Sequence, residues 1–346
     1  MAEKEGSFWT TLPGILTGLA ALLGAIGSLI GVLVSLDDDP APPPAPNSTV
    51  AEETASPDEL AASRIAFLSD RTGDCDVHLV SADGSGEEPL TDNGAIDLRP
   101  DWSPTGQHLA FASNQDGDFD VYIVDVATGQ QRAVIDTDTD EKGPTWSPDG
   151  QQLAFSSTRD GATEIWAMAA AGGAEPVQLT DLNRKSVSPD WSPDNDAVAF
   201  ASNADGDFDI YVMDRDGSDV RNLTGELFDA GADEFDPSWS SDGERISFDG
   251  QRESQDFDIY VVDPDGSDLG NVTAHSADDR RSSWAPDDSR IVFGSDRSVP
   301  PDDTQRGCSI DTRQMDLFTV SADGSGPQRL LSNEADDSSP AWGPLP

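Results

Sequence analysis

The sequence has few basic side chains and almost no lysine. It holds 20 Lys and Arg residues against 67 Asp and Glu residues in 346 positions, so its formal net charge is −47. The only lysines are Lys4, Lys142 and Lys185. A surface this negative repels the phosphates of nucleic acids and of anionic lipids. We therefore expect no nucleic-acid partner, and the charge favours divalent cations, basic protein surfaces or a high-salt environment instead.

Cysteine and histidine are also scarce. Two cysteines are too few for a disulfide scaffold, and the three histidines His78, His108 and His275 are scattered along the chain. The sequence has no Gly-x-Ser-x-Gly nucleophile elbow, and its Ser-Gly phrases lie in expected turns. We therefore predict no catalytic residues, no organic cofactor and no enzymatic activity.

Charge is absent from residues 6–36. The apolar run at residues 12–36 is long enough to cross about 30 Å of hydrocarbon as a helix, which predicts one transmembrane helix there. A cleaved signal peptide is the alternative, although the run is longer than a typical signal core. Lys4 precedes the run and acidic residues follow it, so we expect residues 1–11 in the cytoplasm and the rest of the chain outside it.

The predicted helix contains two Gly-x-x-x-Gly spacings, formed by Gly14 with Gly18 and by Gly27 with Gly31. Such spacings let two helices approach closely and predict a weak helix-mediated dimer, or else the glycines are merely tolerated in lipid. Residues 37–62 form a Pro-rich, acidic segment that cannot bury a core and is expected to act as a linker. The folded domain is expected to cover residues 63–346.

A tryptophan-containing phrase recurs along that domain. Six tryptophans follow one another at 44, 45, 48, 45 and 58 residues, in phrases such as "RPDWSPTG" and "GPTWSPDG": Trp102, Trp146, Trp191, Trp239, Trp284 and Trp342. Each of the first five is followed by a short apolar strand such as "LAF", an acidic loop and a longer apolar strand such as "IYVM". Most units then continue through a turn such as "DPDG" into a polar strand. Four strands per unit are typical of a propeller blade.

The two ends of the domain complement each other. The strand at residues 64–69 has no tryptophan strand before it, and the one at residues 338–346 has nothing after it. Both faces of a blade must be covered by neighbours, which a closed ring achieves. The predicted fold class is all-β: a six-bladed propeller of four-stranded antiparallel blades, closed by the C-terminal strand joining the first blade.

The repeated phrases resemble those of the TolB-type β-propellers, which contain WD-repeat-like "WSPDG" turns. The resemblance covers residues 64–342 and implies the propeller fold. Such propellers serve as protein docking platforms, as lids on peptidases and as parts of lyases, so the resemblance implies no single activity. TolB itself carries an α/β domain before the propeller, where this sequence predicts a membrane helix and a linker.

The expected loops on one face of the ring are strongly acidic. In a propeller blade, the loop between the second and third strands lies on the same face as the loop that leads to the next blade, and together these loops hold more than half of the net negative charge. We expect a protein or cell-envelope component to bind this acidic loop face. An acidic residue precedes the third strand in every unit: Asp76, Asp120, Glu164, Asp209, Asp258 and Asp316. In four units a nearby arginine is expected to pair with it: Arg71, Arg159, Arg252 and Arg297.

Units two and four replace that arginine by Gln115 and Ala204 and add a carboxylate. Their loops read Asn-x-Asp-Gly-Asp-x-Asp, an alternation of oxygen donors around a glycine turn that resembles part of a calcium loop. The candidate calcium ligands are Asn114, Asp116, Asp118 and Asp120, and Asn203, Asp205, Asp207 and Asp209. Asx-turns and solvated carboxylates are the alternative explanation.

Cys75 lies in the expected loop between the second and third strands of the first blade, and Cys308 in the equivalent loop of the sixth. Ring closure makes these blades neighbours, so we expect a disulfide bond between them in an oxidising compartment.

The sequence as a whole favours a non-catalytic, membrane-anchored propeller outside the cytoplasm that binds a protein or envelope component. A carbohydrate- or polymer-processing lyase or hydrolase with a site in the channel and a calcium-stabilised structural module are the alternatives.

Overall fold

The computed structural model describes residues 56–229, 231–251, 256–298, 308 and 314–346. The transmembrane helix predicted at residues 12–36 lies outside these residues. Within the described ranges no helix is long and apolar enough to cross a membrane. The helix α1 (Pro57–Ala62) begins at Ser56, whose hydroxyl accepts the backbone N–H of Glu59 while the Glu59 carboxylate accepts the backbone N–H of Ser56. This capping box satisfies two backbone donors at the helix start.

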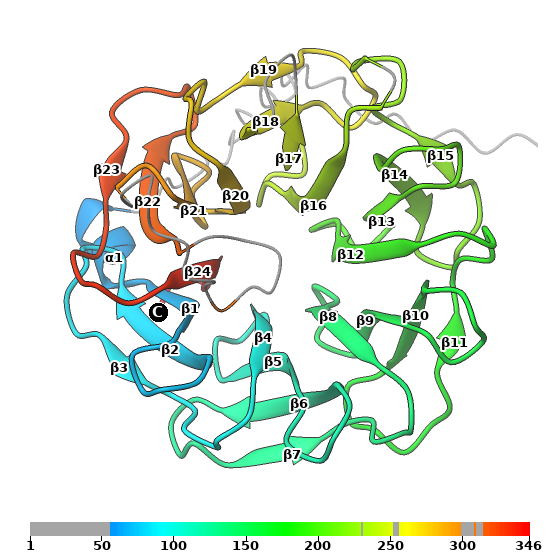
Figure 1. Ribbon diagram of the computed structural model, residues 1–346, viewed down its shortest axis with the longest axis horizontal. Coiled ribbons are helices and arrows are strands. Elements are labelled where there is room, and N and C mark those ends of the chain that lie inside the picture. The colour runs from blue at the N-terminus through cyan, green and yellow to red at the C-terminus, as the bar shows by residue number, and fades with distance from the viewer. Residues whose placement is uncertain (1–55, 230, 252–255, 299–307, 309–313) are drawn as a thin grey trace, which may run out of the picture. The chain divides into compact units, whose positions relative to one another are not determined.

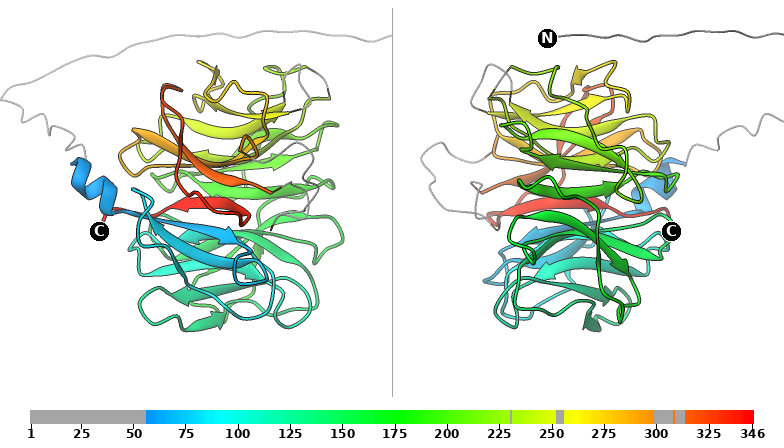
Figure 2. Two further views of the ribbon diagram at one scale, coloured as in Figure 1. Left: turned by 60° about the vertical axis from the view of Figure 1, so that its left-hand side comes forward. Right: turned by 90° about the vertical axis from the view of Figure 1, so that its right-hand side faces the viewer.

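Six four-stranded antiparallel sheets stand as blades around a central channel. Figure 1 shows the ring along the channel, and Figure 2 shows it from two sides. Blade one contains β24, β1, β2 and β3, and each later blade takes the next four strands, up to β20–β23 in blade six. The predicted number of blades is confirmed.

The strands have equivalent places in each blade. The inner strands, next to the channel, are β24 (Asp337–Trp342), β4 (Asp97–Trp102), β8 (Glu141–Trp146), β12 (Ser186–Trp191), β16 (Glu234–Trp239) and β20 (Asp279–Trp284). The second strands are β1 (Arg64–Ser69), β5 (His108–Ser113), β9 (Gln152–Ser157), β13 (Ala197–Ser202), β17 (Ile246–Gln251) and β21 (Arg290–Ser295). The third strands are β2 (Asp76–Ser81), β6 (Asp120–Asp125), β10 (Glu164–Ala169), β14 (Asp209–Asp214), β18 (Phe257–Val262) and β22 (Asp316–Ser321). The outer strands are β3 (Glu88–Pro89), β7 (Gln131–Ala133), β11 (Val177–Gln178), β15 (Arg221–Asn222), β19 (Gly270–Asn271) and β23 (Gln328–Arg329).

The C-terminal strand β24 closes the ring by pairing with β1, as Figure 1 shows where the two ends of the colour scale meet. Ile65 lies opposite Trp342 and Ser69 opposite Asp337 in the antiparallel register. The Trp342 indole N–H also donates to the Ser63 hydroxyl at 2.8 Å. The predicted closure by the C-terminal strand is therefore confirmed.

The core lies between the blades. Each second strand contributes a phenylalanine with no exposed surface: Phe67, Phe111, Phe155, Phe200, Phe248 and Phe293. Each apolar cluster joins two neighbouring blades, and one of them joins Ile65 and Phe67 of blade one to Val292 of blade six. Full burial of such a side chain contributes about 1.5–3 kcal/mol. Because every blade face is covered in this way, the third strands are apolar almost throughout.

Each inner strand contains a β-bulge before its tryptophan. The pairing register shifts there, for example between Leu98 and Asp101 on β4, and the third residue of each inner strand has a positive φ of 49–60°. These six residues are Arg99, Gly143, Ser188, Asp236, Arg281 and Ser339. A proline follows in five of the six strands, and it costs no ladder hydrogen bond because the inner strand is the edge of its sheet. The bulge re-aims the third residue toward the channel, and five of the six residues have a side chain there because the one on β8 is Gly143.

Candidate functional site

The six bulge residues form a ring in the central channel. They line both hollows of the channel, one of about 580 Å³ and one of about 120 Å³. The larger hollow also contacts residues of the acidic loops, such as Asp140 and Phe208, while the smaller one continues along the Pro-x-Trp segments of the inner strands. The ring therefore marks the boundary between the two halves of the channel.

An ion pair crosses the channel within this ring. Arg99 of blade two contacts Asp236 of blade five at 2.5 Å, and these blades face each other across the axis (Figure 1). Arg281 of blade six contacts the second oxygen of Asp236 at 3.4 Å. The Ser188 hydroxyl donates to Asp236 at 2.6 Å, and Arg281 donates to the hydroxyl of Ser339 at 2.8 Å. Side chains of blades two, four and six thus hold the carboxylate of Asp236 within the ring.

The electrostatics of the ring keep Asp236 ionised. Burial by itself would raise the pKa of Asp236, but the charges of Arg99 and Arg281, with hydrogen bonds from Arg99 and Ser188, hold that pKa well below its usual range. Burial lowers the pKa of Arg281, and the charge of Arg99 acts in the same direction. Arginine remains protonated under any ordinary condition, so the ring holds two cations and one anion.

The larger hollow is a basic and aromatic cavity. It is lined by five cationic side chains, Arg99, Lys142, Lys185, Arg280 and Arg281, out of only 20 in the whole chain. Three phenylalanines form the apolar part of its wall: Phe208, Phe235 and Phe257. We call this hollow the channel-mouth cavity.

Contacts within the wall of the channel-mouth cavity hold its aromatic and cationic side chains in place. The rings of Phe208 and Phe235 lie 4.6 Å apart, and the Arg280 guanidinium stacks 3.5 Å from the centre of the Phe257 ring. The Arg280 Nε–H is buried and has no acceptor among the described residues. Lys142 contacts Asp140 at 2.9 Å. A basic, aromatic cavity of this kind suits an anionic group with apolar neighbours.

Sequence reasoning missed this cavity. Four of its cations were visible only as the second or third residues of inner strands, three or four positions before a tryptophan, in "LRPDW", "EKGPTW" and "DRRSSW", and Lys185 stands directly before β12. Placing them together requires the bulge and the convergence of the blades on one axis. A basic residue before Pro-x-Trp is the signal that would have pointed to the channel.

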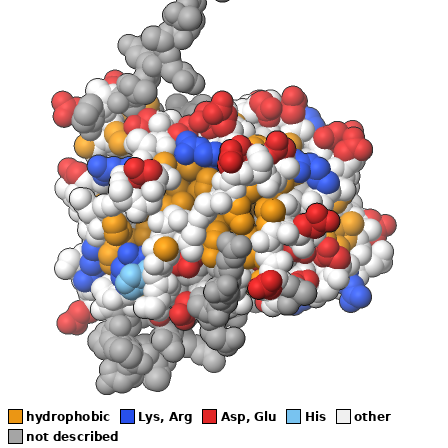
Figure 3. Space-filling view, turned by 90° about the horizontal axis from the view of Figure 1, so that it is seen from above, with side chains coloured by type: hydrophobic (Ala, Val, Ile, Leu, Met, Phe, Trp, Pro, Cys, Tyr) orange, Lys and Arg blue, Asp and Glu red, His pale blue; other side chains and the backbone are white. Residues whose placement is uncertain are grey.

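The acidic loops surround the opening of the channel-mouth cavity. The loops between second and third strands and those between blades lie on one face, as hydrogen bonds between them show: the Asn114 carboxamide oxygen accepts the Ile96 N–H, and the Asp140 carboxylate accepts the Phe119 N–H. We call this the loop face. Acidic side chains are also spread over the side of the propeller that Figure 3 shows.

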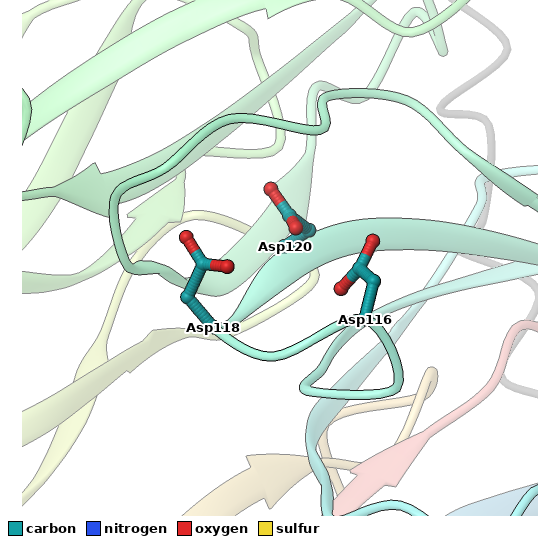
Figure 4. Close-up of side chains that lie close together, drawn as sticks. All are labelled: Asp116, Asp118 and Asp120. Carbon is teal, nitrogen blue, oxygen red and sulfur yellow. The ribbon is translucent and has the colours of Figure 1, made fainter.

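The structure brings together the carboxylates of both candidate calcium loops. Asp116, Asp118 and Asp120 each place one oxygen within 4.8 Å of the others, and Figure 4 shows their carboxylates gathered around the loop. The second group consists of Asp205, Asp207 and Asp209. In both groups the first residue is exposed and the last is buried.

The two asparagines that the sequence suggested as calcium ligands, Asn114 and Asn203, instead accept backbone hydrogen bonds that hold their loops in place. The carboxamide oxygen of Asn114 accepts the backbone N–H of Ile96 at 2.8 Å, and that of Asn203 accepts the N–H of Lys185 at 2.9 Å. Each asparagine thus fastens its loop to the segment that enters the same blade. A tyrosine supports each group as well: Tyr122 donates to Asp116 at 2.9 Å and Tyr211 to Asp205 at 2.8 Å.

The prediction that the loop arginines pair with the acid before the third strand is wrong. Arg71 pairs with Asp337 at 2.6 Å, Arg159 with Glu141 at 3.3 Å and Arg297 with Asp279 at 2.6 Å. Each carboxylate is the first residue of the inner strand of the same blade, not the acid before the third strand. The arginine turns back across the second strand toward the channel side, where the acid is completely buried. Arg252 lies outside the described residues.

Cys75 and Cys308 form a disulfide bond with a Cα–Cα distance of 5.2 Å. It joins the β1–β2 loop of blade one to a residue between β21 and β22 of blade six. The bond therefore links the two blades at which the ring closes. The Asp336 carboxylate accepts the backbone N–H groups of Cys308 and Met315, each at 2.5 Å, and so fixes this corner.

Comparisons with known proteins agree with this architecture. The sequence profile of the TolB beta propeller domain matches residues 54–255. The chain is similar to TolB from Acinetobacter baumannii, with a TM-score of 0.69 and 20% identity over 82% of this chain and 67% of that one. A putative TolB from Agrobacterium tumefaciens gives a TM-score of 0.63 and 21% identity, with coverage of 82% and 99%.

An oligogalacturonate lyase in complex with manganese is similar at a TM-score of 0.52 and 18% identity, covering 79% of this chain and 75% of that one. At these identities the likeness to solved structures concerns the fold alone. No curated protein matches the sequence.

Proposed function

Because the chain belongs to the TolB beta propeller domain family, we propose that it is a non-catalytic binding protein whose loop face docks a protein or cell-envelope component. Propellers of this fold also occur in lyases, so the family does not select an activity by itself. The site must therefore be argued from its own chemistry.

The channel-mouth cavity is the observation that carries the proposal. A chain with a net charge of −47 places five of its 20 cations around one cavity of about 580 Å³. Holding like charges together is unfavourable unless they are compensated. Arg99, Arg281 and Lys142 contact Asp236 or Asp140, whereas no carboxylate among the described residues forms an ion pair with Lys185 or Arg280. An anionic group of the partner would pair with these two cations. The phenylalanines beside Arg280 would contact an apolar part of the same ligand.

The acidic loops around the cavity make a second demand on the partner. A highly charged polyanion is repelled by the loop face before it reaches the cavity, whereas a protein segment with an anionic tip and basic flanks is attracted by both parts. We therefore infer a protein partner, or an envelope component with this mixed charge. This arrangement favours binding over a lyase or hydrolase that acts on a polyanionic sugar.

The proposed location is based on the N-terminal sequence. We propose that residues 12–36 anchor the protein in a membrane and that the propeller lies outside the cytoplasm, at the end of the linker. The disulfide between Cys75 and Cys308 supports an oxidising compartment. Protease added to intact spheroplasts is expected to cleave the propeller, and protection until lysis would reverse the proposed orientation.

Site-specific crosslinking tests the binding proposal. A photo-crosslinking amino acid at Phe208, in the cavity wall, is expected to capture a discrete partner in intact cells. Val177, which is 64% exposed on the outer strand of blade three, is the matched control position. The Phe208 adduct is expected to disappear when Lys185→Glu and Arg280→Glu reverse two cavity charges, and to persist with Arg132→Glu at the outer edge of blade two.

Equal adducts from both positions, or adducts indifferent to the cavity charges, would contradict the proposal. The enzyme alternative is tested on the same preparation. Incubation with anionic and neutral wall polysaccharides should give no new reducing ends and no unsaturated products. Product formation that the cavity variants abolish would assign a polymer-processing activity to the cavity instead.

A further inference from the structure

We propose that the loop between β5 and β6 binds a Ca²⁺ ion through the carboxylates of Asp116, Asp118 and Asp120. The three residues alternate along the loop, and one oxygen of each lies within 4.8 Å of the others. Gly117 has a φ of +136°, which lets the chain turn back so that the carboxylates face a common point (Figure 4). Three like charges this close repel one another unless a cation lies between them.

Among the described residues, two oxygens of the group lack any hydrogen-bond donor. The Asp120 side chain has no exposed surface, and its Oδ1 accepts the backbone N–H of Thr137 while its Oδ2 has no partner in this part of the chain. Oδ2 of Asp118 is likewise buried without a partner. A buried carboxylate oxygen without a donor is costly, and native structures nearly always supply one. A bound cation would satisfy both oxygens at once.

The equivalent acids of the other blades show what is missing. In blade one, Asp76 accepts hydrogen bonds from the hydroxyls of Thr72 and Thr91. In blade three, Glu164 accepts from Thr180 and from two backbone N–H groups. In blade five, Asp258 accepts from Asn271 and Thr273, and in blade six Asp316 contacts Arg329 and Ser298.

Blade two therefore differs from these blades in a specific way. Its loop has Gln115 and Asp116 where blade one has Arg71 and Thr72, and Gln115 and Asp118 where blade three has Arg159 and Ala162. In both comparisons the blade-two loop exchanges a protein cation for an additional carboxylate. Such an exchange is expected where a dissolved cation supplies the charge.

The donor set selects the ion. All three ligands are carboxylate oxygens on one loop, the hard donors that Ca²⁺ and Mg²⁺ prefer, and neither cysteine nor histidine belongs to the group. Ca²⁺ accepts about six to eight oxygens in irregular geometry, so water can complete its shell on the exposed side of Asp116. Mg²⁺ demands strict octahedral geometry and releases its waters reluctantly. We therefore expect preference for Ca²⁺.

The loop between β13 and β14 provides an internal comparison. It has the same three carboxylates, but the Asn222 amide donates to Asp205 at 2.7 Å and to Asp209 at 3.0 Å. A side-chain donor already satisfies the buried acid of this loop. We therefore expect Ca²⁺ to bind there more weakly than at Asp116, Asp118 and Asp120.

Calorimetric titration of the chelator-stripped full chain with CaCl₂, at about 0.15 M NaCl to screen non-specific attraction, tests the site. We expect a dissociation constant between about 10⁻⁵ and 10⁻³ M, and about tenfold or greater weakening by Asp118→Asn. Asp160→Asn is the matched control, because Asp160 has the place of Asp116 in the blade-three loop, which has Ala162 in place of Asp118. Its effect should stay within about twofold.

Terbium luminescence places the ion. Tb³⁺ substitutes for Ca²⁺ and emits when an adjacent phenol transfers excitation energy, and Tyr122 contacts Asp116 directly. Tyr122→Phe should remove most of the tyrosine-sensitised emission at low Tb³⁺, and Tyr211→Phe should remove only the emission that appears at higher Tb³⁺. Added Ca²⁺ should displace the first component before the second.

Two results would overturn the proposal. One is the absence of saturable Ca²⁺ binding, and the other is equal weakening by Asp118→Asn and Asp160→Asn, which would indicate a diffuse counterion atmosphere. Asp116→Asn is a second variant that should fold normally, because Asp116 is exposed and its replacement leaves the core unchanged. A variant that keeps the wild-type circular dichroism spectrum and wild-type affinity also refutes the site.

Discussion

Removing the Cys75–Cys308 disulfide should destabilise the propeller by several kcal/mol, although β24 still closes the ring without it. The bond joins residues that are 233 positions apart. In the folded protein, pairing of β24 with β1 already holds blades one and six together. The disulfide therefore acts mainly on the unfolded chain, whose ends it keeps from separating.

The size of the effect follows from the length of the closed loop. The chain-entropy relation gives about 4.7 kcal/mol for a loop of about 100 residues, and extension to a separation of 233 adds about 0.8 kcal/mol, for an upper value of about 5.5 kcal/mol. Measured disulfides usually contribute about 2–4 kcal/mol. We expect a loss of about 4 kcal/mol, which corresponds to a lowering of Tm by about 8–16 °C in a domain of this size.

The assay is guanidinium denaturation of the wild type and of the Cys75→Ala/Cys308→Ala variant, followed by tryptophan fluorescence. Wild type treated with a reductant should match the variant, because both have the same unconstrained unfolded chain. Arg71→Gln, which breaks an ion pair in the same corner but keeps the disulfide, is the control for local damage. A difference below about 1 kcal/mol between oxidised and reduced wild type would refute the entropic reasoning.

Three further predictions concern the channel and the latch, by which we mean the C-terminal strand β24 that closes the ring. Asp236→Asn should lower the free energy of unfolding by about 3 kcal/mol, which is the lower end for a broken buried pair because the Arg99 side chain is 32% exposed. Adding Arg99→Gln should restore part of this loss in the same denaturation assay. Strict additivity of the two changes would show that the two side chains do not interact. Burial raises the pKa of Asp101 to about 6 and that of Asp190 to about 8, with the charge of Asp101 adding to the shift of Asp190. Because these pKa values are raised in the folded state, the stability that the two groups contribute is complete below about pH 4 and is lost as the pH rises through 6 and then 8. Urea denaturation in chelator should therefore give a higher free energy of unfolding at about pH 5 than at about pH 8.5. The opposite order would contradict the raised pKa values of Asp101 and Asp190. Deletion of residues 337–346 removes the inner strand of blade one and should abolish the single cooperative thermal transition, whereas a melt like that of the intact chain would show that β24 is not the latch.

The repeat was readable because its causes are local. Proline and glycine at fixed turn positions, an apolar strand after each tryptophan and an acidic loop define each blade without reference to any distant residue. The complementary ends then allow only one closure, in which the C-terminal strand joins residues 64–69. Blade number, strand order and closure were therefore predicted from the sequence, and the same closure led to the pairing of Cys75 with Cys308.

The transmembrane helix at residues 12–36, the orientation and the absence of catalysis stay predictions. Their support is sequence hydropathy, charge distribution and residue content. The protease and polysaccharide assays described above test them directly.

Contacts between blades could not be predicted in the same way. The sequence suggested Asp76 as the partner of Arg71, but the arginine reaches Asp337, 266 positions away. Arg99 and Asp236 are 137 positions apart and meet only because opposite blades point at one axis. Which buried carboxylates lack donors, as Asp120 does, is also a question of what neighbouring strands place around them.

The sequence by itself determined how many sheets form, where each strand turns and how the ends join. The reason is that turn preferences and short apolar strands are encoded within a few residues, and that this local pattern recurs in every unit. Only the tertiary structure decided that a strongly acidic chain has a basic channel with an ion pair across it. Its six bulges turn the third residue of each inner strand toward a common centre, and the resulting charge balance depends on the distances between the charged side chains rather than on their order in the chain.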